Sequence, residues 1–119
     1  MKYLMLIKNS EAFRAEPVPQ ALMDAMGELV TRNFQNGTLK DTGGLLPSSE
    51  GFKVRSANRK LTVTDGPFSE SKEIVGGYAM VEVASREEAL RAAREFMDLH
   101  RVHWPSFEGE CEVRPVADM

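Results

Sequence analysis

The sequence predicts an α+β domain in which two helices cover one face of an antiparallel sheet. Strand-like segments lie near both ends of the chain, and two amphipathic helical segments alternate with further strands between them. Two strand segments, residues 3–8 and 76–83, carry apolar side chains on both faces, which is typical of strands that are buried from two sides. The element order and this patterning together give the fold class.

The composition limits the class of protein. With 119 residues, of which 42% are hydrophobic and 28% charged, the chain is expected to form a single domain, residues 1–119, around one core. A net charge of −3 argues against a nucleic-acid partner, because phosphate binding needs clustered Lys and Arg side chains. No stretch approaches the roughly 18 apolar residues of a membrane span. The lone cysteine, Cys111, cannot form an intrachain disulfide, which fits a cytoplasmic location.

The first half of the chain predicts a strand, a helix and a weaker strand. Residues 3–8 form the first strand, since their apolar core is too short for a signal peptide. A helix is expected over residues 20–35, and Asn36 and Gly37 are a plausible C-terminal stop. Residues 39–46 are expected to hold a short strand that a glycine pair interrupts. The apolar residues of the helix recur at spacings of three and four: Leu22, Met26, Leu29, Val30 and Phe34.

The second half predicts a hairpin, a strand, a helix and a final strand. Residues 52–55 and 60–64 are expected to pair as the hairpin, ahead of the strand at 76–83. Residues 85–88 read Ser-Arg-Glu-Glu, a capping box that starts a helix running to about residue 99 or beyond. Residues 110–116 close the chain. This order is that of a ferredoxin-like α+β unit, with both helices on one face of the sheet.

The same patterning predicts a homodimer. If both helices cover one face, the apolar residues of 3–8 and 76–83 that point to the other face would be exposed. Such a patch is larger than monomers usually tolerate. Two sheets packed face to face would bury it, although the cost of association offsets part of the gain.

Residues 64–73 form the most distinctive segment of the chain. They read Thr-Asp-Gly-Pro-Phe-Ser-Glu-Ser-Lys-Glu, directly after one apolar strand and before another. Gly66 is free to adopt a positive φ, and Pro67 fixes its own φ while it removes a donor. The segment is either a tight turn or a polar rim around a cleft.

Four segments together resemble a known family. These segments, residues 2–8, 63–73, 76–78 and 112–115, look like the DGPF branch of the YCII-related proteins, and they span nearly the whole chain. The resemblance implies a dimeric α+β barrel built from ferredoxin-like subunits, in agreement with the dimer argument. It implies little about chemistry, since most members have no assigned activity. Some relatives occur near or joined to sigma factors, which raises a regulatory protein partner as an expectation.

One feature of the family does not carry over. In another branch, a His near the first helix has been proposed to pair with an Asp as an active site. This chain has no His before His100, and the matching region offers only Gln20. That dyad is therefore not expected here.

The candidate site residues each have two interpretations. Asp65 is a candidate general base, but an Asp before Gly-Pro commonly caps its own turn. Lys72 is a candidate for holding an anionic ligand, whereas a charge run at a loop edge is usually solvated. Tyr78 is a candidate ligand-binding residue, with ordinary core packing as the alternative. A pocket between the sheet and the DGPF loop, lined by Asp65, Lys72, Tyr78 and His103, is predicted.

The two histidines form a second cluster. His100 and His103 are spaced so that both lie on one face of the second helix, near its apolar stripe. A firm metal site needs a third ligand, and no such pattern accompanies them, so no metal is predicted. Stabilisation by the helix C-terminal dipole is the simpler interpretation. No glycine-rich phosphate loop is present either, and no cofactor is predicted.

Three function classes remain open. The favoured one is a dimeric small-ligand-binding or regulatory module. The second is a small acid–base enzyme of lyase or isomerase type that acts on a polar metabolite, with Asp65 as base and His103 or Tyr78 as its partner. The third is a purely structural domain.

Overall fold

The computed structural model describes residues 1–10, 17–68 and 73–118. It contains two α-helices, one short 3-10 helix and six strands among these residues. In chain order they are β1 (Lys2–Asn9), α2 (Gln20–Gln35), β2 (Leu39–Gly44), the 3-10 helix η1 (Ser48–Glu50), β3 (Phe52–Ala57), β4 (Lys60–Asp65), β5 (Ile74–Glu82), α3 (Arg86–His103) and β6 (Gly109–Pro115).

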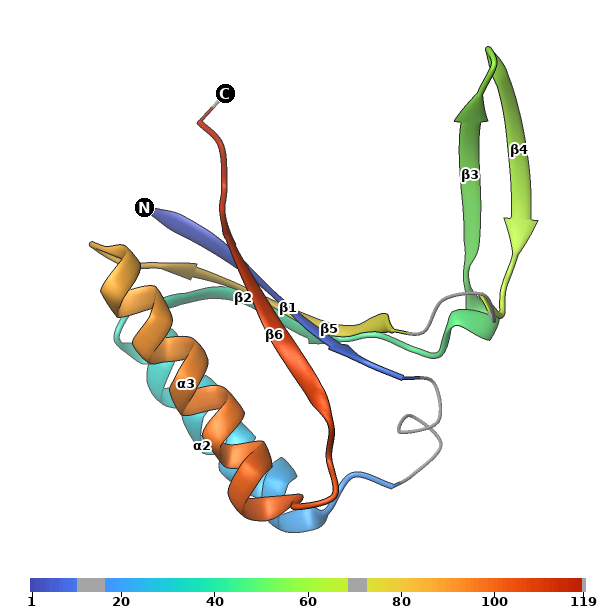
Figure 1. The fold of residues 1–119 in the computed structure, drawn as a ribbon. Coiled ribbons are helices and arrows are strands. Elements are labelled where there is room, and N and C mark those ends of the chain that lie inside the picture. The colour runs from blue at the N-terminus through green and yellow to red at the C-terminus, as the bar shows by residue number, and fades with distance from the viewer. Residues whose placement is uncertain (11–16, 69–72, 119) are drawn as a thin grey trace.

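The body of the molecule has two layers. One is a four-stranded antiparallel sheet in the order β2-β5-β1-β6, and the other is the pair α2 and α3, which lies against one face of the sheet (Figure 1). The strands that are apolar on both faces, β1 and β5, are the central ones. The predicted α+β class is therefore confirmed, and the arrangement is consistent with a ferredoxin-like fold.

The core lies between the sheet and the helices. Successive β1 residues point to opposite faces, so Tyr3 and Met5 face the helices, where they are 5% and 3% exposed. Cys111 and Val113 of β6 pack against this cluster. The helix α3 turns Ala89 and Ala93 inward and leaves Leu90 exposed, so its buried stripe is made of small side chains. The main buried cluster consists of Tyr3, Met5, Leu39, Val81, Ala89 and Ala93.

The helix ends follow the sequence signals closely. The Ser85 side chain accepts a hydrogen bond from the Glu88 N–H at 3.2 Å, and Glu88 Oε2 accepts one from the Ala84 N–H at 2.9 Å. This is the predicted capping box, which satisfies two N–H groups at the start of α3. Asn36 caps the end of α2, and Gly37 follows with φ +83°. No helix among the described residues is long and apolar enough to cross a membrane.

The face of the sheet opposite the helices is apolar at its centre. The register pairs Leu4 with Met80 and Leu6 with Tyr78, so these four side chains share that face. We call these four residues the open sheet face. All four are half-buried in the single chain, and Lys8 and Glu112 form an ion pair beside them at 2.6 Å.

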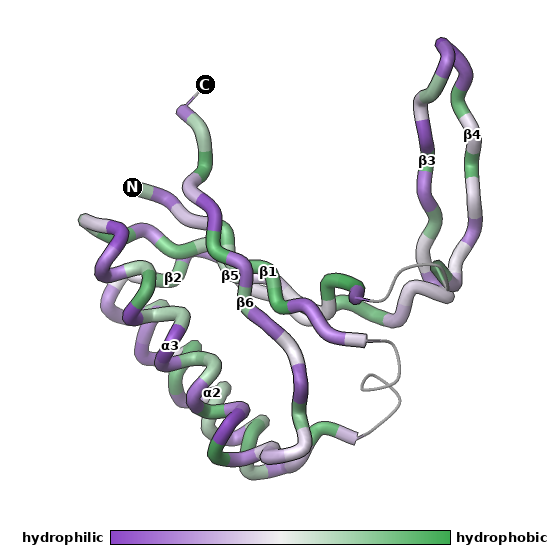
Figure 2. Tube along the Cα trace, in the orientation of Figure 1, coloured by the Kyte–Doolittle hydropathy of each residue, from purple (hydrophilic) through white to green (hydrophobic). Residues whose placement is uncertain are grey.

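The strands β3 and β4 form a separate two-stranded sheet. They extend away from the body as a hairpin, on the side of the four-stranded sheet opposite the helices (Figure 1). Asn58 and Arg59 make the turn with φ angles of +51° and +65°, which is typical of a tight two-residue hairpin loop. Hydrophobic and hydrophilic residues alternate along both strands (Figure 2).

Candidate functional site

The DGPF loop is held by its backbone against η1. The Gly66 N–H donates to the Gly51 carbonyl at 2.9 Å, and the Phe68 N–H donates to Ser48 Oγ at 3.1 Å. Ser48 is buried, and the Lys53 ammonium lies 4.2 Å from the centre of the Phe68 ring. These contacts give the first part of the loop a structural role at the base of the hairpin.

The predicted site residues of this loop lie apart from the helices. Asp65 is the last residue of β4, and its exposed carboxylate has no hydrogen bond or ion pair with any described residue. Lys72 lies outside the described residues, so its role stays a prediction. His103 ends α3 on the other side of the molecule from the hairpin (Figure 1). The described residues therefore do not bring Asp65 and His103 together.

The Tyr78 side chain forms a hydrogen bond with the neighbouring strand β2. Its hydroxyl donates to Asp41 Oδ2 at 3.2 Å, and this carboxylate raises the pKa of Tyr78 above its ordinary value. The ring lies over Gly43, where an added Cβ would be 2.9 Å from Tyr78 Cε1. A glycine at position 43 thus makes room for the tyrosine ring.

A cavity of about 550 Å³ lies between the helices and the sheet. This is within the usual range for small-molecule sites. Of the three predicted site residues that the structure describes, Asp65, Tyr78 and His103, only Tyr78 is among the residues that line it. No charged side chain of the described residues lines the cavity, and its polar side chains are few. They are Asn9, Asn33, Thr42 and His100; Tyr78 also lines the cavity, although its side chain points to the opposite face of the sheet.

Asn9 lines the cavity and carries an unsatisfied side-chain oxygen. It is the last residue of β1 and only 8% exposed, and its Oδ1 atom is buried without a hydrogen-bond partner among the described residues. A buried acceptor without a partner costs about 1–3 kcal/mol. Because Asn9 lines the cavity, a ligand that carries a hydrogen-bond donor would satisfy this acceptor once the amide turns toward it.

His100 lies in the wall in its neutral form. It is 6% exposed, and burial lowers the pKa of its ring below the ordinary value. Its Nδ1 lies 3.1 Å from the Phe96 carbonyl oxygen, which can only accept, so Nδ1 carries the proton. The ring nitrogen Nε2 is then an acceptor.

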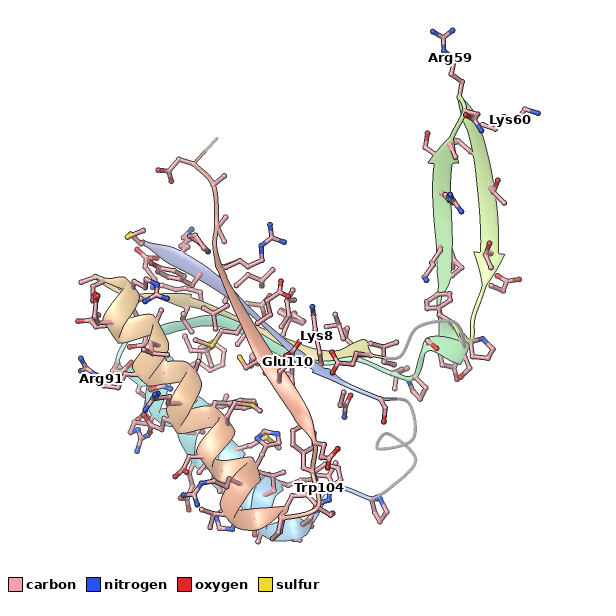
Figure 3. The ribbon with its side chains drawn as sticks, viewed as in Figure 1. Lys8, Arg59, Lys60, Arg91, Trp104 and Glu110 are labelled. Atoms are coloured by element: carbon pink, nitrogen blue, oxygen red, sulfur yellow. The ribbon has the colours of Figure 1, made fainter. Side chains whose placement is uncertain are left out.

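Aromatic rings surround His100. The centre of its ring lies 4.9 Å from that of Phe96 and 4.8 Å from that of Phe107, which in turn lies 5.3 Å from Trp104. Trp104 follows the last residue of α3, near the start of β6 (Figure 3). These separations are favourable for aromatic pairs, so this end of the cavity suits a flat apolar group.

Comparison with known proteins places the chain in a family. Residues 1–97 match the model of the YCII-related domain. The chain belongs to the YCII-related family. It is also 29% identical over 120 residues to the uncharacterized protein R00369 of Rhizobium meliloti (strain 1021), and the match covers 98% of this chain and 93% of that protein. The predicted resemblance to the YCII-related family is thus confirmed, and the DGPF branch stays a prediction.

Sequence reasoning missed most of the cavity of this YCII-related domain. It singled out His103, whereas the structure places His100 in the wall. Asn9 went unnoticed because a polar residue at a strand end normally signals a turn. The available signal was its odd-numbered position in β1, which puts it on the same face as Tyr3 and Met5.

Proposed function

We propose that this protein is a dimeric module that binds a small, uncharged and largely apolar ligand in the cavity between its helices and its sheet. The observation that carries the proposal is the buried Asn9 Oδ1 atom, which has no partner among the described residues. Natural cores rarely leave such an acceptor unsatisfied without a functional reason.

The wall of the cavity indicates the chemistry of the ligand. Asn9 Oδ1 and His100 Nε2 are both acceptors, so the ligand should carry a hydroxyl or amino donor. The rings of Phe96, Trp104 and Phe107 favour an aromatic body. Since no described Lys or Arg lines the cavity, an anionic ligand would be buried without a counter-charge.

Two isosteric probes test this proposal. We would measure the binding of 2-naphthol and of 2-methylnaphthalene to the dimer by calorimetry and by the shift in melting temperature. The native protein should prefer 2-naphthol by about two- to tenfold, the value of one neutral hydrogen bond. An Asn9→Leu variant should bind both probes equally well.

A filled cavity provides the control. Gly44 lines the cavity, and nothing lies within 4 Å of a Cβ added there, so Gly44→Leu should fold normally and occupy the space. It should bind neither probe. If the native protein binds neither probe, or if Gly44→Leu binds both unchanged, the cavity is not the site.

The dimer of this proposal is supported by the open sheet face. Leu4, Leu6, Tyr78 and Met80 form a contiguous apolar centre that the described part of the chain leaves without a covering layer. Sedimentation equilibrium at micromolar concentration should give twice the 13.3 kDa mass of the chain. A clean monomer at these concentrations would contradict this part of the proposal.

The acid–base alternative has less support. It requires Asp65 near a histidine or near Tyr78, and no interaction among the described residues joins them. Asp41, and not Asp65, is the carboxylate that meets Tyr78. The ligand-binding function is therefore the better supported of the two.

A further inference from the structure

The β3–β4 hairpin exposes an apolar face. Its register pairs Val54 with Val63 and Ser56 with Leu61, so alternate residues of the two strands point to the same side. We call Phe52, Val54, Leu61 and Val63 the apolar hairpin face. Their side chains are 67%, 56%, 74% and 65% exposed, and none of the described residues covers them.

This exposure is unusual for a hairpin of this kind. An isolated two-stranded hairpin is at best marginally stable in water, and adjacent exposed apolar side chains commonly mark an interaction surface. Here the two strands contact chiefly each other and extend away from the body (Figure 1). The hairpin therefore fits a role as an arm that packs on another molecule.

The charge of the hairpin indicates on which molecule the arm packs. The hairpin carries Lys53, Arg55, Arg59 and Lys60 against the single carboxylate Asp65, a net charge of +3. The whole chain has a net charge of −3, so the remainder carries −6. Two hairpins would repel each other, whereas a hairpin and the body of a second copy would attract. Arg59 and Lys60 lie at the tip, far from the body of their own chain (Figure 3).

The position of the hairpin fits the same partner. It extends on the side of the sheet opposite the helices, which is the side of the open sheet face (Figure 1). A second copy stacked on that face would have its sheet about 10 Å away. Strands of six residues reach about 20 Å, so the hairpin is long enough to pass the second sheet.

We propose that the hairpin is an arm that clasps the second copy of this chain. The apolar hairpin face packs against the flank of the second copy, and the basic tip lies against its acidic body. This inference rests on the homodimer of the proposed function. It adds a second contact surface, distinct from the open sheet face.

Two matched variants test the arm. Leu61→Asp introduces a carboxylate on the apolar hairpin face, and Thr62→Asp introduces one on the opposite face at the next position. Both positions are exposed in the single chain, so both variants should keep the monomer fold, as circular dichroism would check. By sedimentation equilibrium, Leu61→Asp should raise the dimer Kd by about tenfold or more, the effect of exposing one buried leucine. Thr62→Asp should raise it by less than about threefold.

Hydrogen exchange on the native protein gives a second readout. Peptides that cover residues 52–65 should exchange at least about tenfold more slowly above the dimer Kd than below it, because docking would hold a hairpin that is marginal alone.

The outcomes separate the arm from the rest of the proposal. If the native protein is a dimer and Leu61→Asp leaves the dimer Kd unchanged, the proposed arm is wrong while the homodimer stands. The same conclusion follows if the hairpin exchanges at the same rate above and below the dimer Kd. A native protein that stays monomeric would overturn both. The binding measurements with 2-naphthol and 2-methylnaphthalene test independently of either result whether the cavity is the ligand-binding site.

Discussion

Gly66 approaches Ser48 so closely that a Cβ atom built on Gly66 would lie 1.7 Å from the backbone oxygen of Ser48. The obstacle is backbone, which cannot rotate away as a flexible side chain can. The glycine of the DGPF segment is thus needed for packing against η1, at the point where the hairpin joins the body.

Gly66→Ala should therefore destabilise the base of the hairpin. Overpacking of this kind typically costs about 1–3 kcal/mol, which urea denaturation and hydrogen exchange of residues 48–68 would measure. Gly51→Ala is the matched control, since its Cβ would lie 3.7 Å from the same Ser48 oxygen, an ordinary contact. Equal stability of the two variants would mean that the loop moves away from η1 without cost.

Asn9→Leu should stabilise the free protein while it weakens ligand binding. The substitution removes the unsatisfied acceptor and adds apolar contacts in the wall, and we expect a gain of about 1 kcal/mol in the free energy of unfolding. Gains in stability that cost function are typical of binding sites. A loss of more than about 1 kcal/mol in urea denaturation would instead assign Asn9 a structural role.

His100 should make the stability depend on pH. Its pKa is lowered in the folded protein from the ordinary value of 6.5, because burial disfavours the charged ring. The unfolded chain then binds more protons, so the stability from this group is complete above pH 6.5 and falls as the pH drops through the lowered pKa. His100→Phe should flatten this part of the profile in chemical denaturation.

Gly27→Ala should stabilise α2. Gly27 lies inside this helix, and nothing lies within 4 Å of a Cβ added there. Alanine is favoured over glycine in a helix interior by about 0.5–1 kcal/mol, so the melting temperature should rise. Because Gly27 also lines the cavity, an unchanged affinity for 2-naphthol would show that the methyl group does not reach the ligand.

Much of the fold could be predicted because its signals are local. The 3.6-residue period gave α2 its bounds, and Ser85 with Glu88 marked the start of α3. The two-sided apolar pattern of β1 and β5 identified the central strands, since only a buried position makes that pattern stable. The sequence predicts that β5 begins at the glycine pair Gly76 and Gly77, two residues later than its start at Ile74 in the structure.

The cavity depended on the tertiary structure. Asn9, His100 and Phe107 come from a strand end, a helix end and a loop, and no sequence period relates them. The close approach of Gly66 to the Ser48 backbone likewise brings together residues that the hairpin separates in the chain. By itself the sequence determined which face of the central strands and of α2 turns inward, because neighbours along the chain fix that periodicity, whereas in α3 the structure buried Ala89 and Ala93 and left Leu90 exposed. Which inward side chains meet, and where they leave a space, was decided only when the sheet order and the helix positions brought distant segments together.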